Sequence, residues 1–386
     1  MALNLSYRSS QIIQSEIRNM SIECERVNGI NLSQGICDLE LPLPVKLGAT
    51  EAISGGINHY TRYDGLSELR EAISRKLMRD NGIHADPEKN IVVSGGSTGA
   101  FYCACLALLN PGDEVILFEP YYGYHVNTLL AVDAVPVYAS LEPPTWSIDF
   151  DALEGLISPR TKGMMINTPA NPSGKVFGKE ELNQLAEFAL RHELFVFTDE
   201  IYEYFVYDNN VHISPGALES IADQTITISG YSKTFSITGW RIGYAVCHEK
   251  WAQMIGYVND LIYVCGPAPL QMGVARGIDE LPDTYYQSLC QQYSNKRDKI
   301  CGTLAKIGLE PYVPQGAYYV LSNVKNLPGS SSKEKAMFLL NQTGVATVPG
   351  EAFYADGTGE NLVRFCFAKD DDIVDEACQR LLQLRL

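Results

Sequence analysis

The stretch SGYSKTFSITGWRIG, residues 229–243, sets Lys233 among glycine, serine and threonine residues and ends near Arg241. A lysine that only meets solvent needs no such setting, whereas a lysine that carries a covalent cofactor does. Its amine forms a Schiff base with a carbonyl group. Gly230, Ser232 and Gly239 would let the backbone approach a ligand, and arginine can donate two parallel hydrogen bonds to a phosphate. A lone lysine is more often a surface residue, so the interpretation depends on the rest of the chain.

The composition is ordinary for a globular protein. Its 386 residues suit two domains, or one large domain with an appendage. No apolar run approaches the roughly 20 residues of a membrane helix, and the first residues lack the apolar core of a signal peptide. We therefore expect a cytoplasmic protein that does not enter membranes. The net charge of −16 argues against nucleic acid as a partner, because phosphate contacts need clustered Lys and Arg.

The ten cysteines are scattered, and several lie inside apolar runs such as FYCACLALL. Disulfide frameworks are typical of short secreted chains, so we expect buried, reduced thiols. Cys103 and Cys105 stand too close together for the usual zinc spacing and lack a second pair of ligands. No metal site is predicted.

From about residue 90, short apolar runs alternate with helical stretches such as EELNQLAEFALRHE. The runs, which we predict to be buried strands, are IVVSG, EVILFEP, AVPVYAS, KGMMINTP, LFVFTDE, TITISG and IGYAVC. Strands joined by helical crossovers predict a mainly parallel sheet covered on both faces. Ligands bind such sheets at the carboxyl ends of the strands, which is where several unusual residues follow a strand: Ser97, Tyr122, Asn171, Asp199 and Lys233.

The last hundred residues have a different pattern. A helical stretch leads into GAYYVLSNV, a further helix, GVATVPG, LVRFCFA and a final helix. This order predicts a smaller α+β domain. The amino-terminal segment is expected to pack with it, because INLSQG would then reach the same cleft.

Asp199 ends an apolar run that would lie at the centre of the sheet. A buried carboxylate is costly unless it is paired, and the protonated ring nitrogen of pyridoxal phosphate would pair it; a helix N-cap explains the residue equally well. Tyr202, one helical turn later, would reach the phenolic oxygen of that ring, although such a tyrosine is more often a packing residue. Asn171, in NTPANPSG, would bond the same oxygen, but Asn-Pro also initiates turns.

The segment GGSTGAFYCACL, residues 95–106, opens a helix with small residues, so free N–H groups and Ser97 and Thr98 would face a phosphate. Helix capping alone also explains this pattern. Tyr122 would stack on the cofactor ring or pack in the core. Arg364 stands within an apolar strand, where charged residues are rarely unpaired; its partner would be a substrate carboxylate or an internal acidic residue.

Together these segments resemble the class I aminotransferases of fold type I, which depend on pyridoxal phosphate. The stretch from Gly230 to Gly243 agrees with the lysine signature of that family at every fixed position. The other segments occur in the family's order and spacing over essentially the whole chain: HYTRYDGLSELREAI, NTPANPSG, TDEIYE, GVATVPG and VRFCFA. The resemblance implies an α/β fold with a seven-stranded, mainly parallel sheet in a large domain, residues 45–285, and a smaller α+β domain from residues 1–44 and 286–386.

The resemblance also implies roles around the cofactor ring. Lys233 would form the Schiff base and then move the proton at the substrate Cα. Asp199 would pair with the ring nitrogen, Tyr202 and Asn171 would hold the phenolic oxygen, and Tyr122 would stack on the ring.

For the phosphate, the resemblance implies contacts from Ser97, Thr98, Ser232 and Arg241. Tyr60 would reach the phosphate of a neighbouring subunit, which implies a homodimer with shared active sites. Arg364, Asn171 and the backbone of Gly35 would fix the substrate carboxylate.

The chain departs from the family pattern at two places. Many relatives have a serine at the position of Gly230, so one phosphate hydroxyl is missing or replaced by Ser229 or Ser232. In SQGICDLELP, Cys37 and Leu39 stand where relatives usually have proline and an aromatic residue, and this loop covers the substrate. We expect Cys37 to be a small packing residue rather than a reactive thiol.

Bacterial aspartate-specific relatives often carry lysine at the position of Ser97, so its absence disfavours a dicarboxylic amino acid. An aromatic, sulfur-containing or other neutral side chain is favoured instead. Four tyrosines would suit such a side chain if they line the cleft, although many of the 22 tyrosines must be structural: Tyr63, Tyr124, Tyr318 and Tyr319.

The sequence therefore predicts an enzyme that moves the amino group of an L-amino acid to a 2-oxo acid. A β-lyase, cyclase or synthase acting through the same cofactor remains the alternative, because fold and cofactor do not fix the reaction. A cofactor-sensing transcription factor is disfavoured, since the motifs fill residues 35–364 and the chain is acidic.

Overall fold

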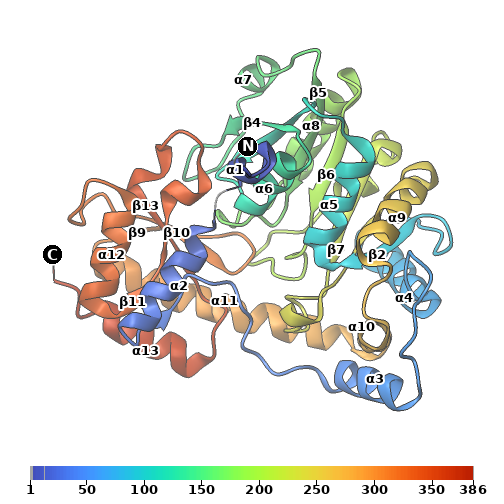
Figure 1. The fold of residues 1–386 in the computed structure, drawn as a ribbon. Coiled ribbons are helices and arrows are strands. Elements are labelled where there is room, and N and C mark those ends of the chain that lie inside the picture. Colours follow the sequence, from blue (N-terminus) through green and yellow to red (C-terminus); the bar gives the residue numbers. More distant parts are fainter. Residues whose placement is uncertain (1–2, 13, 386) are drawn as a thin grey trace.

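A seven-stranded sheet forms the centre of the larger part of the molecule (Figure 1). The computed structural model describes residues 3–12 and 14–385. The strand order is β2-β8-β7-β6-β5-β3-β4. The strands in chain order are β2 Ile91–Gly95, β3 Glu114–Glu119, β4 Val135–Ser140, β5 Thr161–Asn167, β6 Phe195–Asp199, β7 Thr225–Gly230 and β8 Ile242–Val246. β8 runs antiparallel to both of its neighbours, and the other neighbouring strands are parallel. The predicted mainly parallel sheet is confirmed.

Successive residues of the central strands face opposite layers of helices, as the strand period of two requires. Ile116 of β3 packs with the helix α8, Lys179–Arg191. Its neighbours Val115 and Leu117 pack in the cluster formed by α5, Gly96–Leu108, α6, Gly123–Ala131, and α9, Glu249–Tyr263. β4 departs from the expected burial, because its residues are half-buried or exposed. It lies at the sheet edge, and among the described strands it pairs with β3 alone, so no described strand covers its other side.

The helices of this part cover both faces of the sheet. They are α3 Leu43–Ser54, α4 Ser67–Lys76 with a π-helical turn Leu77–Asn81, α5 Gly96–Leu108, α6 Gly123–Ala131, α7 Phe150–Glu154, α8 Lys179–Arg191, α9 Glu249–Tyr263 and α10 Ala268–Glu280. The short α1, Tyr7–Gln11, packs on α6. Single 3-10 turns occur at Pro215–Ala217, Ala222–Gln224 and Thr238–Trp240. α8 is the amphipathic helix expected from its sequence, and its buried face includes Leu182, Leu185 and Phe188.

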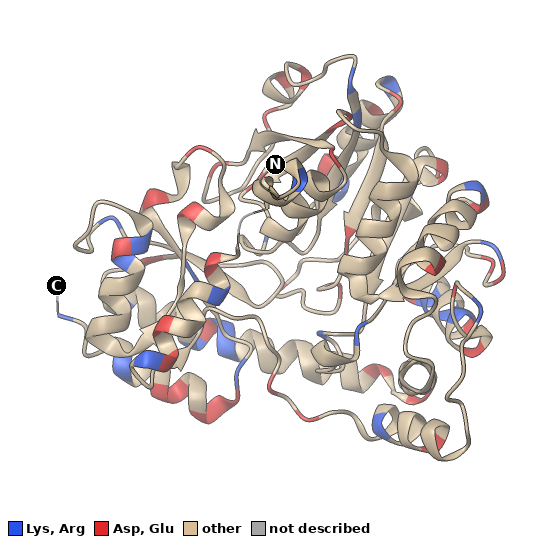
Figure 2. Ribbon diagram, viewed as in Figure 1, with Lys and Arg blue, Asp and Glu red and all other residues tan. Residues whose placement is uncertain are grey.

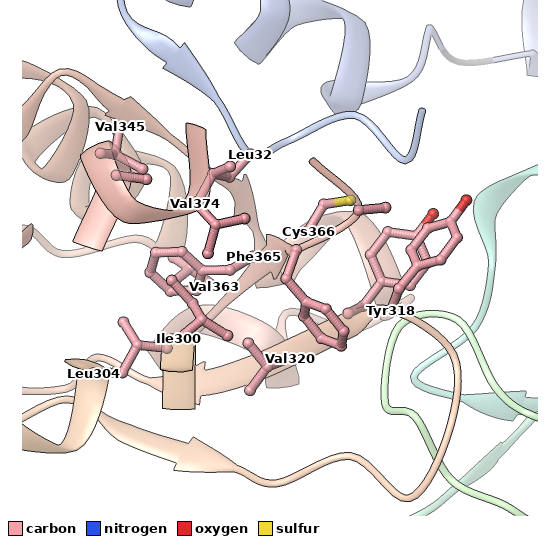
Figure 3. Packing of buried hydrophobic residues seen from close by; sticks show 14 of the residues in the cluster. Leu32, Ile300, Leu304, Tyr318, Val320, Val345, Val363, Phe365, Cys366 and Val374 are labelled. Atoms are coloured by element: carbon pink, nitrogen blue, oxygen red, sulfur yellow. The ribbon is translucent and has the colours of Figure 1, made fainter. Parts of the chain in front are cut away.

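The smaller part is built on a four-stranded antiparallel sheet in the order β12-β13-β10-β9. Its strands are β9 Glu310–Tyr312, β10 Tyr319–Asn323, β12 Val348–Pro349 and β13 Leu362–Cys366. The helices α11 Asp283–Lys306, α12 Ser332–Thr343 and α13 Asp371–Leu381 cover it, with 3-10 turns at Gly350–Phe353 and Thr358–Asn361. Figure 3 shows Val320, Val363 and Phe365 of this sheet packed against Ile300 and Leu304 of α11.

The amino-terminal segment packs with the smaller part. α2, Glu16–Arg26, is followed by β1, Ile30–Asn31, which pairs parallel with β11, Val345–Ala346. Leu32 enters the same apolar cluster (Figure 3). This pairing brings Gln34 and Gly35 to the wall of a cavity between the two parts.

The predicted domain boundaries near residues 45 and 285 stay a prediction. Tyr285, in the first turn of α11, contacts apolar clusters on both sides of the proposed division.

The described residues, 3–12 and 14–385, contain no helix that is long and apolar enough to cross a membrane.

Candidate active site

A cavity of about 660 Å³ opens between the two parts, at the carboxyl ends of β3, β5, β6 and β7. Its size suits a small-molecule ligand. Among the residues to which the family resemblance assigns a contact with cofactor or substrate, only Tyr60 does not line it. The others do: Gly35, Ser97, Thr98, Tyr122, Asn171, Asp199, Tyr202, Ser232, Lys233, Arg241 and Arg364.

Lys233 stands in the turn that follows β7, and its side chain opens onto the cavity. Nζ donates a hydrogen bond to the carbonyl oxygen of Gly35 over 3.0 Å and lies 5.9 Å from the ring centre of Tyr318. Loss of hydration in the protein lowers the pKa of this amine below its ordinary value. A larger fraction of the amine is therefore neutral, which is the form that acts as nucleophile or base.

Asp199 is the last residue of β6, and its carboxylate faces the cavity. Oδ2 lies 2.9 Å from Nε2 of His125, and Oδ1 accepts from the backbone N–H of Ile201 over 3.3 Å. No described helix begins at Asp199, so the N-cap alternative is wrong. The chain continues instead as turns, which also corrects the helical spacing assumed for Tyr202.

His125, a residue of α6, contacts the Asp199 carboxylate, and the sequence did not predict this contact. Its ring meets Tyr122 edge-on, with centroids 5.3 Å apart, and Tyr122 stacks on Tyr124 at 5.2 Å. The signal lay in the segment EPYYGYHV, where a histidine stands three positions after Tyr122, in the first turn of α6.

Arg364 is a buried cation with no acidic partner among the residues that the structure describes. Its Nη1 donates to Oδ1 of Asn171 over 2.7 Å, and Nη2 donates to the carbonyl oxygen of Ser33 over 2.6 Å. Nε has no partner. The guanidinium also lies 4.2 Å from the ring centre of Tyr319, whose hydroxyl is 3.0 Å from that of Tyr202. Because a buried charge is costly without a counter-charge, this group is suited to an incoming anion.

The other end of the cavity combines Arg241 with the first turn of α5. Arg241 adopts a left-handed backbone conformation, with φ 56°. Its Nη1 donates to the carbonyl of Thr238 over 3.0 Å and Nη2 to the carbonyl of Gly95 over 3.2 Å. Gly96 has φ +81°, and a side chain there would come within 2.4 Å of the guanidinium. Ser97 and Thr98 follow at the start of the 13-residue helix, whose first N–H groups favour a phosphate.

Gly230 does not open space for a ligand, contrary to expectation. It lies in β7, and a side chain there would meet Cα of Gly243 in β8 at 3.0 Å. The hydroxyl of Ser229 donates to Oε1 of Glu203 over 3.0 Å and is buried. The Ser and Thr residues that line the cavity near Arg241 are Ser97, Thr98, Ser232 and Thr238.

Two of the four tyrosines considered for the cleft, Tyr124 and Tyr319, line the cavity. Tyr63 packs on Tyr257, and Tyr318 lies behind the wall, where its hydroxyl donates to the carbonyl of Gly35 over 3.2 Å. Cys37 is buried, and burial raises the pKa of its thiol. A packing role fits this residue better than a reactive one.

Tyr60 lies 83% exposed and outside the cavity of its own chain. A further group of residues, from α2 and its N-cap residue Ser15, lines the cavity mouth and was not expected: Ser15, Ile17, Arg18, Ser21, Ile22 and Glu25.

The family model described as aminotransferase class I and II matches residues 27–381. The chain is 34% identical to a probable N-succinyldiaminopimelate aminotransferase of Mycobacterium tuberculosis, with 94% of each chain covered. It is 33% identical to an aspartate aminotransferase of Pyrococcus abyssi, covering 98% of this chain and 97% of that one. The solved structure of YbdL from Escherichia coli, described as having a methionine aminotransferase function, superposes with a TM-score of 0.95 at 30% identity, covering 99% and 100% of the two chains.

Proposed function

Because this chain belongs to the class I and II aminotransferase family, we propose that it moves the amino group of a neutral L-amino acid to a 2-oxo acid, with pyridoxal phosphate held in the cavity. One observation carries the proposal. The cavity joins Lys233, whose amine has a lowered pKa, to Arg241 and Arg364, which have no acidic partner among the described residues. A cavity that contains an amine and two anion-binding arginines suits a cofactor with a phosphate group and a substrate with a carboxylate.

The donor set of the cavity fits pyridoxal phosphate. The unpartnered Nε of Arg364 and the glycine cradle at Gly96 are features that an anion would use. Four residues would hold the phosphate: Ser97, Thr98, Ser232 and Arg241. Asp199 would pair with the ring nitrogen, Tyr202 and Asn171 with the phenolic oxygen, and Tyr122 with the ring face. When bound, pyridoxal phosphate supplies an electron sink that makes the Cα–H of an amino acid acidic.

The residues of this chain then have separable tasks. Arg364 binds the substrate carboxylate through its free Nε and, with Asn171, fixes the orientation of Cα. Lys233 Nζ takes the proton from Cα, and its lowered pKa keeps the amine able to accept it. His125 keeps the Asp199 carboxylate in place by a hydrogen bond on the side away from the ligand.

The residues that line the cavity support the proposal that the donor amino acid has a neutral side chain. Tyr124 and Tyr319 line the cavity with Ile17, Ile22 and Ile36, and no lysine stands at position 97. The test is a panel of L-amino acids at fixed acceptor, with assays for both 2-oxo acid and ammonia. Aromatic or sulfur-containing donors should be fastest, and ammonia should stay at background. Ammonia in step with turnover would overturn the assignment in favour of a β-lyase.

We also propose a homodimer in which Tyr60 completes the phosphate site of the partner. Exposed apolar side chains support it; they include Leu43, Leu47 and Ile53 of α3 and Met254, Tyr257 and Leu261 of α9.

Shared sites can be tested by mixing two inactive variants, Tyr60→Ala and Lys233→Ala, after dissociation and reassociation. Each hybrid dimer would contain one intact site, so random mixing should restore about a quarter of the sites. Activity that stays at the level of the separate variants would contradict shared sites.

A further inference from the structure

The arginines of this chain divide into two groups by their partners. Within the ranges that the structure describes, most arginines have a carboxylate partner. Four do not: Arg18, Arg241, Arg364 and Arg385. Arg385 stands next to the carboxyl terminus, whereas the other three all line the cavity. The proposed function gives Arg241 and Arg364 an anion each, and leaves Arg18 without one.

Scarcity of acidic residues does not explain the free guanidinium of Arg18. The chain has 46 Asp and Glu residues against 30 Lys and Arg, and Figure 2 shows both signs interspersed along α2 and over both parts. On the same helix, Arg26 pairs with Glu23, and Glu16 pairs with Lys333. Arg18 is exposed in the first turn of α2 and has no side-chain hydrogen bond or ion pair with any described residue.

The surroundings of Arg18 suit an anion. Ser15 and Ser21 line the same mouth, and the first turn of a helix carries partial positive charge. Glu25 also lines the mouth, but it stands seven residues further along α2, which at 1.5 Å per residue places it roughly 10 Å away. Its charge is exposed and therefore partly screened. The attraction between Arg18 and a carboxylate in direct contact with it is therefore stronger than the repulsion between that carboxylate and Glu25.

We propose that Arg18 is a specificity-determining residue that binds a second carboxylate, at the far end of the 2-oxo acid acceptor. Donor and acceptor occupy one site in turn in an aminotransferase, so this inference rests on the proposed function. The apolar wall accepts the neutral donor while Arg18 remains in solvent. When a dicarboxylic 2-oxo acid enters, Arg364 binds the carboxylate next to the carbonyl and Arg18 binds the distal one. This gives the enzyme two substrate classes without a lysine at position 97.

The test compares two acceptors of equal chain length, 2-oxopentanedioate and 2-oxopentanoate, with one neutral donor. Wild type should prefer the dicarboxylic acceptor in kcat/KM. Arg18→Gln should lower kcat/KM for 2-oxopentanedioate about 10- to 100-fold, the usual value of a hydrogen bond to a charged group, and change that for 2-oxopentanoate less than about threefold. Arg18→Lys should recover part of the loss. The matched control is Arg26→Gln, which removes the same charge from the same helix outside the cavity lining and should leave the ratio of the two acceptors unchanged.

A second measurement does not depend on turnover. Pentanedioate and pentanoate, which cannot react, would be titrated into the cofactor-loaded protein and followed by thermal shift. Pentanedioate should bind more tightly to wild type than to Arg18→Gln. The role of Arg18 would be overturned if Arg18→Gln lowered kcat/KM equally for both acceptors, or if pentanedioate bound equally well to wild type and to Arg18→Gln. An enzyme that fails with every donor and acceptor but still shows the pentanedioate difference would contradict the proposed function instead.

Discussion

Replacing Lys233 with alanine is expected to abolish turnover while leaving the fold intact. The side chain lines the cavity and makes one hydrogen bond, to the carbonyl of Gly35, so its loss removes little packing. It is the amine in the cavity that can take the Cα proton, and a positioned base alone contributes about 10²–10⁴ in rate. Loss of the covalent link to the cofactor adds to this. We therefore expect kcat to fall at least about 10⁴-fold.

The measurement is kcat with the best donor, together with the visible spectrum after loading with pyridoxal phosphate. The band of the lysine-bound cofactor should be absent. Lys306→Ala, at an exposed position at the end of α11, is the control and should match wild type. Retention of more than about one hundredth of the wild-type kcat would contradict the role of Lys233.

Replacing Asp199 with asparagine is expected to have the second largest effect. The change keeps the shape of the side chain but removes the charge that would keep the cofactor ring nitrogen protonated. A preorganised electrostatic group of this kind is worth about 10²–10³ in kcat. The expected result is a fall of that size in kcat, with a smaller change in KM, because Arg364 still binds the substrate carboxylate.

The control for this variant is Asp223→Asn, since Asp223 is an exposed aspartate outside the cavity. Near-wild-type values are expected from it. A kcat for Asp199→Asn within about tenfold of wild type would show that the ring nitrogen does not need this carboxylate.

The strands of the large sheet could be predicted because each is a short apolar run bounded by turn residues. Their order could not. Pairing of β2 with β8, far apart in the chain, depends on long-range contacts that no local pattern contains. The same limit explains β4, which has the sequence of a strand but the partial burial of a sheet edge.

The site residues that directly follow strands could be predicted from the sequence, since the carboxyl ends of parallel strands lie at one edge of the sheet. The pair His125–Asp199 could not, because its two residues, in α6 and at the end of β6, are 74 positions apart in the chain. Gly230 was misinterpreted for a related reason. Its neighbour in space is Gly243 on the next strand, and only the pairing of β7 with β8 shows that the glycine makes room for backbone. The contribution of α2 to the cavity mouth also depends on tertiary packing.

The role of Lys233, Arg241 and Arg364 in a transamination is tested most directly by a single-turnover reaction. The purified protein would be loaded with pyridoxal phosphate and mixed with one neutral L-amino acid without an acceptor. We expect the visible band to disappear, one equivalent of 2-oxo acid to form per site, and no ammonia to be released. Ammonia released over repeated turnovers, or a protein that forms no visible band with the cofactor, would contradict it.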